Sequence, residues 1–158
     1  MNENFIRNPN DLKIADLLSD RPTVGNNVPV VLWRLIRLVG LYNILGEEAQ
    51  TVSYFTGKNI GKMFETKNLD ELCQQLTDLK IGKLDFSVNA DLIQISIREC
   101  LTCAGITPPL GKPICHLEAG LVAGALENIY AGKKISSNET KCIGGLGDEF
   151  CLIECKII

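Results

Sequence analysis

The sequence predicts an α+β domain, in which N-terminal helices pack with an antiparallel four-stranded sheet and one long crossing helix. Three observations lead to this fold. Apolar residues recur at helical spacing as far as Leu79. The period then changes to two over residues 83–98, which is typical of strands with one solvent-facing side. A helical stretch at 113–130 separates these strands from a second strand-like pair.

Length and composition indicate a globular protein. A chain of 158 residues is long enough for one domain that buries about two-thirds of the surface of its unfolded chain. We expect an N-terminal extension with a short helix over 1–23 and a single domain over 24–158. A net charge of −3 without a basic stripe argues against nucleic acid as a partner.

The cysteine content points to metal. The first ten residues lack the apolar core of a secretory signal, so we expect a cytoplasmic protein. Thiols stay reduced in the cytosol, so metal binding explains the seven cysteines better than disulfides do. Intracellular disulfides of extreme thermophiles are the known exception.

Residues 28–45 form the most apolar run. It approaches the length of a membrane span, but Arg34 and Arg37 lie near its centre. Each arginine would cost roughly 2.5–3.5 kcal/mol in the middle of a bilayer. Their three-residue spacing places both on one helical face, so the run predicts a largely buried amphipathic helix and no membrane anchor.

Two more helices and a hairpin follow. The chain breaks at Gly46 and predicts a helix to Phe64; Asn68 is then suited to the N-cap of another helix. That helix carries one apolar stripe: Leu69, Leu72, Leu76 and Leu79. Alternating residues on either side of a turn at 89–91 predict an antiparallel hairpin.

The last third contains a loop, a helix and a strand pair. Glycines and prolines predict a loop over 101–112, and Pro113 is suited to the first turn of a helix that ends at Tyr130. Residues 134–141 and 150–158 are the expected strands. Gly144 and Gly145 belong to a glycine-rich turn between them.

Four residues of this third are candidate ligands for zinc, which takes four thiolate, imidazole or carboxylate ligands. Cys151 and Cys155 are four residues apart on a strand, roughly 13 Å, so they cannot share one ion. His116 points about 100° away from Cys115 on a helix, so one of the two coordinates. The expected strand pair brings its own donors near the start of that helix. The proposed ligands are Cys115, Glu139, Cys142 and Cys151.

Four protein ligands leave no open position, so such a site is structural. The alternative is that these cysteines are ordinary buried residues that pack as small hydrophobic groups. Cys100-x2-Cys103 is either a redox pair or a second metal half-site, and one such pair is a weak signal. No catalytic set is indicated, since His116 and Glu118 do not share a helical face.

The chain resembles the 4-vinyl reductase (4VR) domain family. The shared features are Cys115 with the helix glycines Gly120 and Gly124, then Glu139-x2-Cys142, and Cys151 before an apolar strand. The resemblance implies a fold shared with transport-particle (TRAPP) subunits and haem-NO-binding domains, helix-mediated homodimers, and a pocket for small apolar molecules. In related aromatic-sensing activators, zinc held by Cys, Glu, Cys and Cys supports the pocket; those ligands map onto the four residues proposed above.

We therefore favour a non-enzymatic, homodimeric module that binds a small hydrophobic or aromatic molecule and carries a structural zinc. Aromatic residues at helical spacing are candidate pocket walls, although such residues are more often plain core. These candidates are Trp33, Tyr42, Tyr54, Phe55 and Tyr130. The alternatives are an enzyme or accessory of tetrapyrrole metabolism, for which no reductant site is visible, and a dimeric interaction scaffold.

Overall fold

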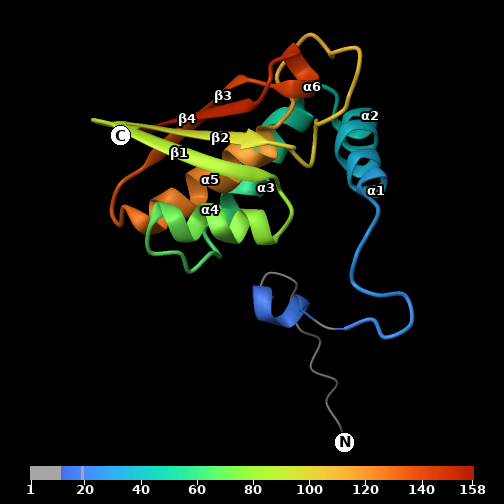
Figure 1. Ribbon diagram of the computed structural model, residues 1–158, viewed down its shortest axis with the longest axis horizontal. Coiled ribbons are helices and arrows are strands. Elements are labelled where there is room, and N and C mark those ends of the chain that lie inside the picture. The colour runs from blue at the N-terminus through green and yellow to red at the C-terminus, as the bar shows by residue number, and fades with distance from the viewer. Residues whose placement is uncertain (1–11, 19) are drawn as a thin grey trace, which may run out of the picture.

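The computed structural model describes residues 12–18 and 20–158. A four-stranded antiparallel sheet lies over a layer of helices, as predicted (Figure 1). Its strand order is β1-β2-β4-β3, so β1 and β3 form the two edges. The strands are β1 (Lys83–Asn89), β2 (Leu92–Arg98), β3 (Ile135–Lys141) and β4 (Cys151–Ile157). Both predicted strand pairs are confirmed.

One face of the sheet is buried against helices. The alternation of β2 turns Ile93, Ile95 and Ile97 inward, and β4 turns Cys151, Ile153 and Cys155 to the same side. The helices on this face are α3 (Glu48–Gly61), α4 (Leu69–Asp78) and α5 (His116–Ile129). Asn68 caps α4 by accepting a hydrogen bond from the Glu71 amide, as its side chain predicted.

Helices α3 and α5 touch backbone to backbone. A Cβ on Gly57 or Gly61 would lie 2.1 Å from a carbonyl oxygen of α5, and one on Gly120 or Gly124 would lie 2.0–2.1 Å from a carbonyl oxygen of α3. The smooth glycine face of α5 therefore seats on a helix, whereas the sequence favoured seating on the sheet. Close packing at Gly57 and Gly61 was predicted.

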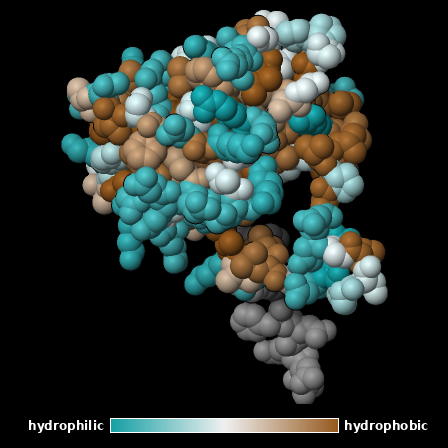
Figure 2. Space-filling view, in the orientation of Figure 1, coloured by the Kyte–Doolittle hydropathy of each residue, from teal (hydrophilic) through white to brown (hydrophobic). Residues whose placement is uncertain are grey.

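The apolar run of 28–45 is helical, as α1 (Val30–Arg34), the π-helical segment η3 (Leu35–Gly40) and α2 (Leu41–Leu45). The prediction that it is largely buried is wrong. Arg37 is the buried residue of this run, while most of the aliphatic side chains face outward (Figure 2). No helix of residues 12–18 and 20–158 is long and apolar enough to cross a membrane.

Smaller departures concern helix ends and the N-terminus. Helix α5 begins at His116 with Cys115 as its N-cap, so Pro113 precedes the helix instead of opening its first turn. The turn between β3 and β4 contains a one-turn helix, α6 (Ile143–Leu146). Near the N-terminus only a short 3-10 helix, η2 (Ile14–Leu17), is described, and Ile14 packs against the core. The expected fraying of 1–10 lies outside the described residues.

Candidate functional site

Five of the seven cysteines gather with one glutamate before the start of α5. The Sγ atoms of Cys100 and Cys115 are 3.5 Å apart, and those of Cys103 and Cys151 are 3.2 Å apart. Cys115 Sγ also lies 3.9 Å from Cys142 Sγ and 3.9 Å from Cys151 Sγ. All five cysteines have zero exposure and are free thiols. This is a closed, sulfur-rich cluster.

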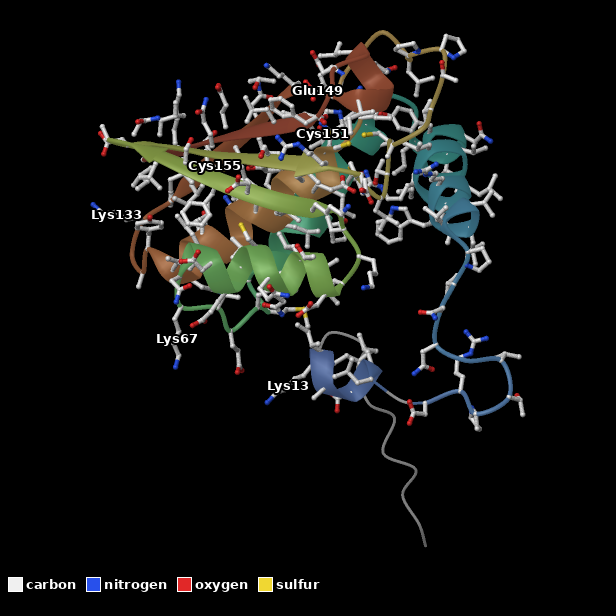
Figure 3. The ribbon with its side chains drawn as sticks, viewed as in Figure 1. Lys13, Lys67, Lys133, Glu149, Cys151 and Cys155 are labelled. Atoms are coloured by element: carbon white, nitrogen blue, oxygen red, sulfur yellow. The ribbon has the colours of Figure 1, made fainter. Side chains whose placement is uncertain are left out.

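Different elements deliver these donors. Cys100 and Cys103 follow the end of β2, Cys115 caps α5, and Cys151 is the first residue of β4 (Figure 3). Glu139 lies on β3, two and four residues beyond Ser137 and Ile135, so the period of the strand turns all three to the inner side. A register shift after Glu139 ends regular pairing, and Cys142 then caps α6.

The cluster fits a tetrahedral metal ion. Zinc binds sulfur at about 2.3 Å, which separates tetrahedral sulfurs by roughly 3.8 Å. The distances of 3.5–3.9 Å around Cys115 match that value. Two sets of four donors each lie within 4.8 Å of one another: Cys115, Glu139, Cys142 and Cys151, and Cys100, Cys103, Cys115 and Cys151. The four ligands predicted from the sequence are thus brought together, and the pair Cys100 and Cys103 joins them.

Glu139 has an unfilled valence toward the cluster. Its Oε2 atom accepts a hydrogen bond of 2.8 Å from the Cys115 amide. Its Oε1 atom is buried and has no hydrogen-bond partner. Burial, with Cys142 nearby, raises the pKa of this carboxyl to about 9. A buried carboxylate oxygen of this kind needs a cation or a proton.

The short helix α6 holds the other side of the cluster. A Cβ on Gly145 would lie 2.2 Å from the Lys112 carbonyl oxygen and 2.8 Å from Cys142 Sγ, so only glycine fits there. The Asp148 carboxylate accepts a hydrogen bond from the Cys142 amide. The Ile143 amide donates to Cys151 Sγ at 3.5 Å, which favours a thiolate.

The remaining candidate donors lie outside the cluster. Cys155 is four residues from Cys151 on β4, as the spacing predicted (Figure 3). Burial raises the pKa of Cys155 to about 12 and that of Cys73 to about 11, so both stay thiols near neutral pH. His116 lines a neighbouring cleft, and burial lowers its pKa.

That cleft lies between α3, the start of α5 and the edge strand β3. It has a volume of about 400 Å³. Its lining combines aromatic, hydroxyl and amide groups: Gln50, Thr51, Tyr54, Phe55, His116, Ala119, Ser136, Ser137, Asn138 and Glu139. Glu139 therefore belongs both to the cleft and to the cysteine cluster.

Two of the five predicted wall residues, Tyr54 and Phe55, line this cleft. The other three lie elsewhere. Trp33 Nε1 donates to Thr102 Oγ1, Tyr42 lies beneath the Lys112 ammonium, and Tyr130 ends α5. A role for these three in ligand binding stays a prediction.

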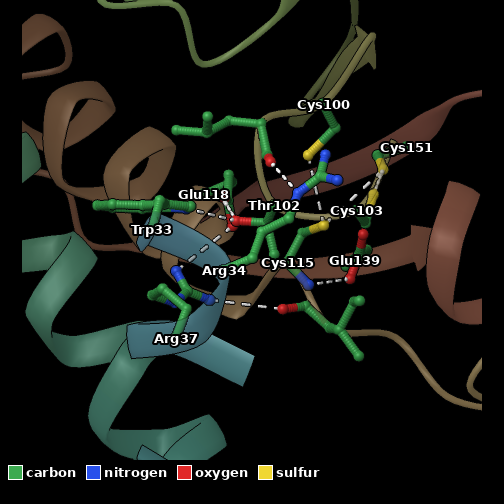
Figure 4. A network of polar contacts seen from close by, with 12 residues as sticks. Trp33, Arg34, Arg37, Cys100, Thr102, Cys103, Cys115, Glu118, Glu139 and Cys151 are labelled. Atoms are coloured by element: carbon green, nitrogen blue, oxygen red, sulfur yellow. Dashed lines mark hydrogen bonds and ion pairs between the residues drawn. The ribbon is translucent and has the colours of Figure 1, made fainter. Parts of the chain in front are cut away.

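A buried polar network connects the cluster region to α1 and η3 (Figure 4). Glu118 accepts a hydrogen bond from Thr102 and lies 3.8 Å from Arg37, whose Nη2 reaches the Ile114 carbonyl. Burial raises the pKa of Glu118. Sequence reasoning missed this pair, although a glutamate within an apolar helix and an arginine within an apolar run are each a signal that they pair.

Comparison with known proteins agrees with the geometry. A family model for the vinyl-4-reductase (4VR) domain matches residues 93–157, which include every residue of the cysteine cluster. The uncharacterized protein MJ1642 of Methanocaldococcus jannaschii is 36% identical over 135 residues, covering 85% of this chain and 81% of the relative. The chain belongs to the vinyl-4-reductase domain family. This confirms the resemblance inferred from the sequence.

Other relatives and solved structures show the same fold. The uncharacterized protein MJ0150 of the same organism is 33% identical over 154 residues, covering 91% of this chain and 86% of the relative. A vinyl-4-reductase family protein from M. jannaschii superposes with a TM-score of 0.67 at 24% identity, covering 85% of each chain. The phenol-responsive sensory domain of the transcription activator PoxR, solved with phenol, gives 0.65 at 17% identity and covers 82% of this chain and 75% of that one.

A more distant neighbour extends the fold comparison. A trafficking protein particle complex subunit 3 from Naegleria fowleri, solved covalently bound to palmitic acid, gives a TM-score of 0.59 at 12% identity. It covers 82% of this chain and 95% of that one. The fold relationship to transport-particle subunits, expected from the resemblance, is therefore confirmed.

Proposed function

We propose that this vinyl-4-reductase family protein is a non-enzymatic, homodimeric module that binds a small, mostly apolar or aromatic molecule beside a structural zinc site. The observation that carries the proposal is the position of Glu139, which lines the cleft and faces the cysteine cluster. A ligand site and a metal site that share one side chain support each other.

The proposed zinc ligands are Cys115, Glu139, Cys142 and Cys151. Their donor atoms lie within 4.8 Å of one another, and all four residues are buried. When bound, zinc would act as a crosslink between α5 and the two strands that follow it. Cys115 belongs to the cap of α5, and the other three belong to the β3–β4 connection. We therefore expect the metal to hold one wall of the cleft in place.

The cleft is suited to a small ring with a polar substituent. Tyr54 and Phe55 offer aromatic surface, and Ser136, Asn138 and Gln50 offer hydrogen-bonding groups. A related fold has been solved with phenol as the ligand of the PoxR sensory domain. Phenol is therefore the probe we choose first.

The homodimer is supported by the outer face of the helix formed by α1, η3 and α2. Its exposed aliphatic side chains are Val30, Val31, Leu32, Leu35, Ile36, Val39 and Ile44. Figure 2 shows apolar surface gathered over this part of the molecule. A second copy that pairs the same face would cover it, because a two-fold interface is self-complementary. The same surface favours the second candidate function, an interaction scaffold.

Titration with phenol, followed by calorimetry, tests the binding proposal. We expect the wild-type chain to bind and Phe55→Ala to bind at least about tenfold more weakly, because a tenfold loss corresponds to about 1.4 kcal/mol of aromatic contact. Phe150→Ala is the matched control. Phe150 packs beside Arg98 and Lys141 and is not a lining residue of the cleft, so its loss should leave phenol affinity unchanged.

Mass spectrometry under native conditions separates the alternatives. A co-purifying apolar compound supports the binding module. An empty dimer that does not bind phenol supports the scaffold. A bound tetrapyrrole would contradict the proposal and favour an enzyme or accessory of tetrapyrrole metabolism.

A further inference from the structure

We propose that the cysteine cluster holds one metal ion in either of two shells, in which Cys100 and Cys103 replace Glu139 and Cys142. Cys115 and Cys151 are common to both shells. The inference rests on the proposed metal site and extends it to a second, all-sulfur site.

Distances support the second shell at least as well as the first. Cys100 Sγ lies 3.5 Å from Cys115 Sγ, and Cys103 Sγ lies 3.2 Å from Cys151 Sγ. In the first shell the corresponding sulfur distances from Cys115 are 3.9 Å. Each group of four donors lies within 4.8 Å, so neither shell needs a large movement of the chain.

The two shells exclude each other. Two ions bound at about 2.3 Å to the same pair of sulfurs, 3.9 Å apart, would lie roughly 2.4 Å from one another. Two-metal sites in proteins keep their ions about 3.5–4 Å apart. Repulsion between two dications grows as they approach, so the cluster takes one ion at a time.

The second ligand pair is held in place by the surrounding chain. The Leu101 amide donates to the Ile81 carbonyl, and the Ala104 amide donates to the Cys100 carbonyl. Arg34 donates to the carbonyls of Leu101 at 3.0 Å and Ala104 at 2.7 Å. Residues 100–104 are therefore fastened to α1, as Figure 4 shows.

The two pairs face different parts of the molecule. Glu139 lines the cleft, whereas Cys100 and Cys103 belong to the segment that contacts α1. A cleft ligand that engages the Glu139 carboxylate would weaken the first shell and favour the second. Exchange of ligands on one ion then couples the cleft to the helix with the exposed apolar face. Softer ions favour the all-sulfur shell.

Paired variants loaded with Zn²⁺, and then with Co²⁺ as a spectroscopic substitute, test the inference. We expect Glu139→Gln/Cys142→Ser and Cys100→Ser/Cys103→Ser each to retain one ion per chain. The first should show four thiolates on cobalt and the second three, read from thiolate-to-cobalt absorption per bound ion. Cys151→Ser/Cys115→Ser removes the shared sulfurs and should lose the ion.

The outcomes separate this inference from the metal proposal. A Glu139→Gln/Cys142→Ser chain that folds without metal, while Cys100→Ser/Cys103→Ser keeps one ion, overturns the second shell and leaves the first. Two ions in the wild type overturn mutual exclusion. A wild type that binds neither ion removes both proposals.

X-ray absorption of the wild type loaded with Cd²⁺ decides the same question if the first paired variant fails to fold. Cadmium is softer than zinc, so we expect four sulfur ligands in the wild type and three sulfurs with oxygen in Cys100→Ser/Cys103→Ser. Three sulfurs with oxygen in both chains overturn the inference.

Discussion

Glu127 lies near the end of α5 between two lysines of the preceding helical segment. Its carboxylate lies 2.8 Å from Lys58 Nζ and 3.1 Å from Lys62 Nζ, and it accepts a hydrogen bond from the Ile135 amide. Burial alone would raise the pKa of Glu127, but the hydrogen bonds from Lys58, Ile135 and Lys62 lower it to about 2. This one side chain therefore ties α3, α5 and β3 together.

Replacing Glu127 should make stability depend on pH in a defined way. Its folded pKa of about 2 lies below the unfolded value of about 4.3. The stabilisation is therefore complete above pH 4.3 and is lost as the pH falls toward 2. We expect Glu127→Gln to lower the free energy of unfolding by about 1–2 kcal/mol at pH 7, with the difference shrinking toward pH 2.

Urea unfolding at pH 7, 4 and 2.5 measures this difference. Glu149→Gln, on the exposed loop before β4, serves as the control and should have little effect. A deficit for Glu127→Gln that is equal at all three pH values would contradict the ion-pair explanation.

At the scale of elements, the contact between α3 and α5 sets how closely the helices approach beneath the sheet. Their glycines leave no room for a methyl group. A Cβ on Gly61 would lie 2.1 Å from the Leu121 carbonyl oxygen, and backbone cannot yield as a side chain would. The contact also positions His116 and Ala119 on the wall of the cleft.

Gly61→Ala should therefore force the two helices apart. We expect a loss of about 3 kcal/mol or more in unfolding free energy, at the upper end of what overpacking costs. Gly40→Ala is the matched control, since its Cβ would lie 3.4 Å from the Leu35 carbonyl oxygen, an ordinary contact. There alanine should be neutral or stabilise by up to about 1 kcal/mol. Equal midpoints in urea for both variants would contradict close packing.

At the scale of the whole molecule, local patterns predicted the elements better than their surroundings. The alternation around 89–91 and the cap at Asn68 are local signals, and both were confirmed. Burial of the 28–45 helix was wrong because Arg37 enters the protein to meet Glu118, a residue about 80 positions away. Hydropathy alone cannot indicate that a charged side chain has a buried partner and that its apolar neighbours face outward.

The candidate site shows the same division. Glu139, Cys142 and Cys151 fall on one strand pair, so their meeting followed from a hairpin prediction. Cys100 and Cys103 are followed by the 101–112 loop, whose path the sequence does not determine, and their place beside Cys151 appears only in the folded chain. The tertiary position of that loop brings these two further sulfurs to the cluster.

The central claim is that this cluster binds a metal ion, and elemental analysis of the purified chain tests it most directly. We predict one zinc per wild-type chain and none in Cys115→Ser/Cys151→Ser, with circular dichroism confirming that the variant is folded. Negligible metal in the wild type, or equal metal in both chains, would contradict the account.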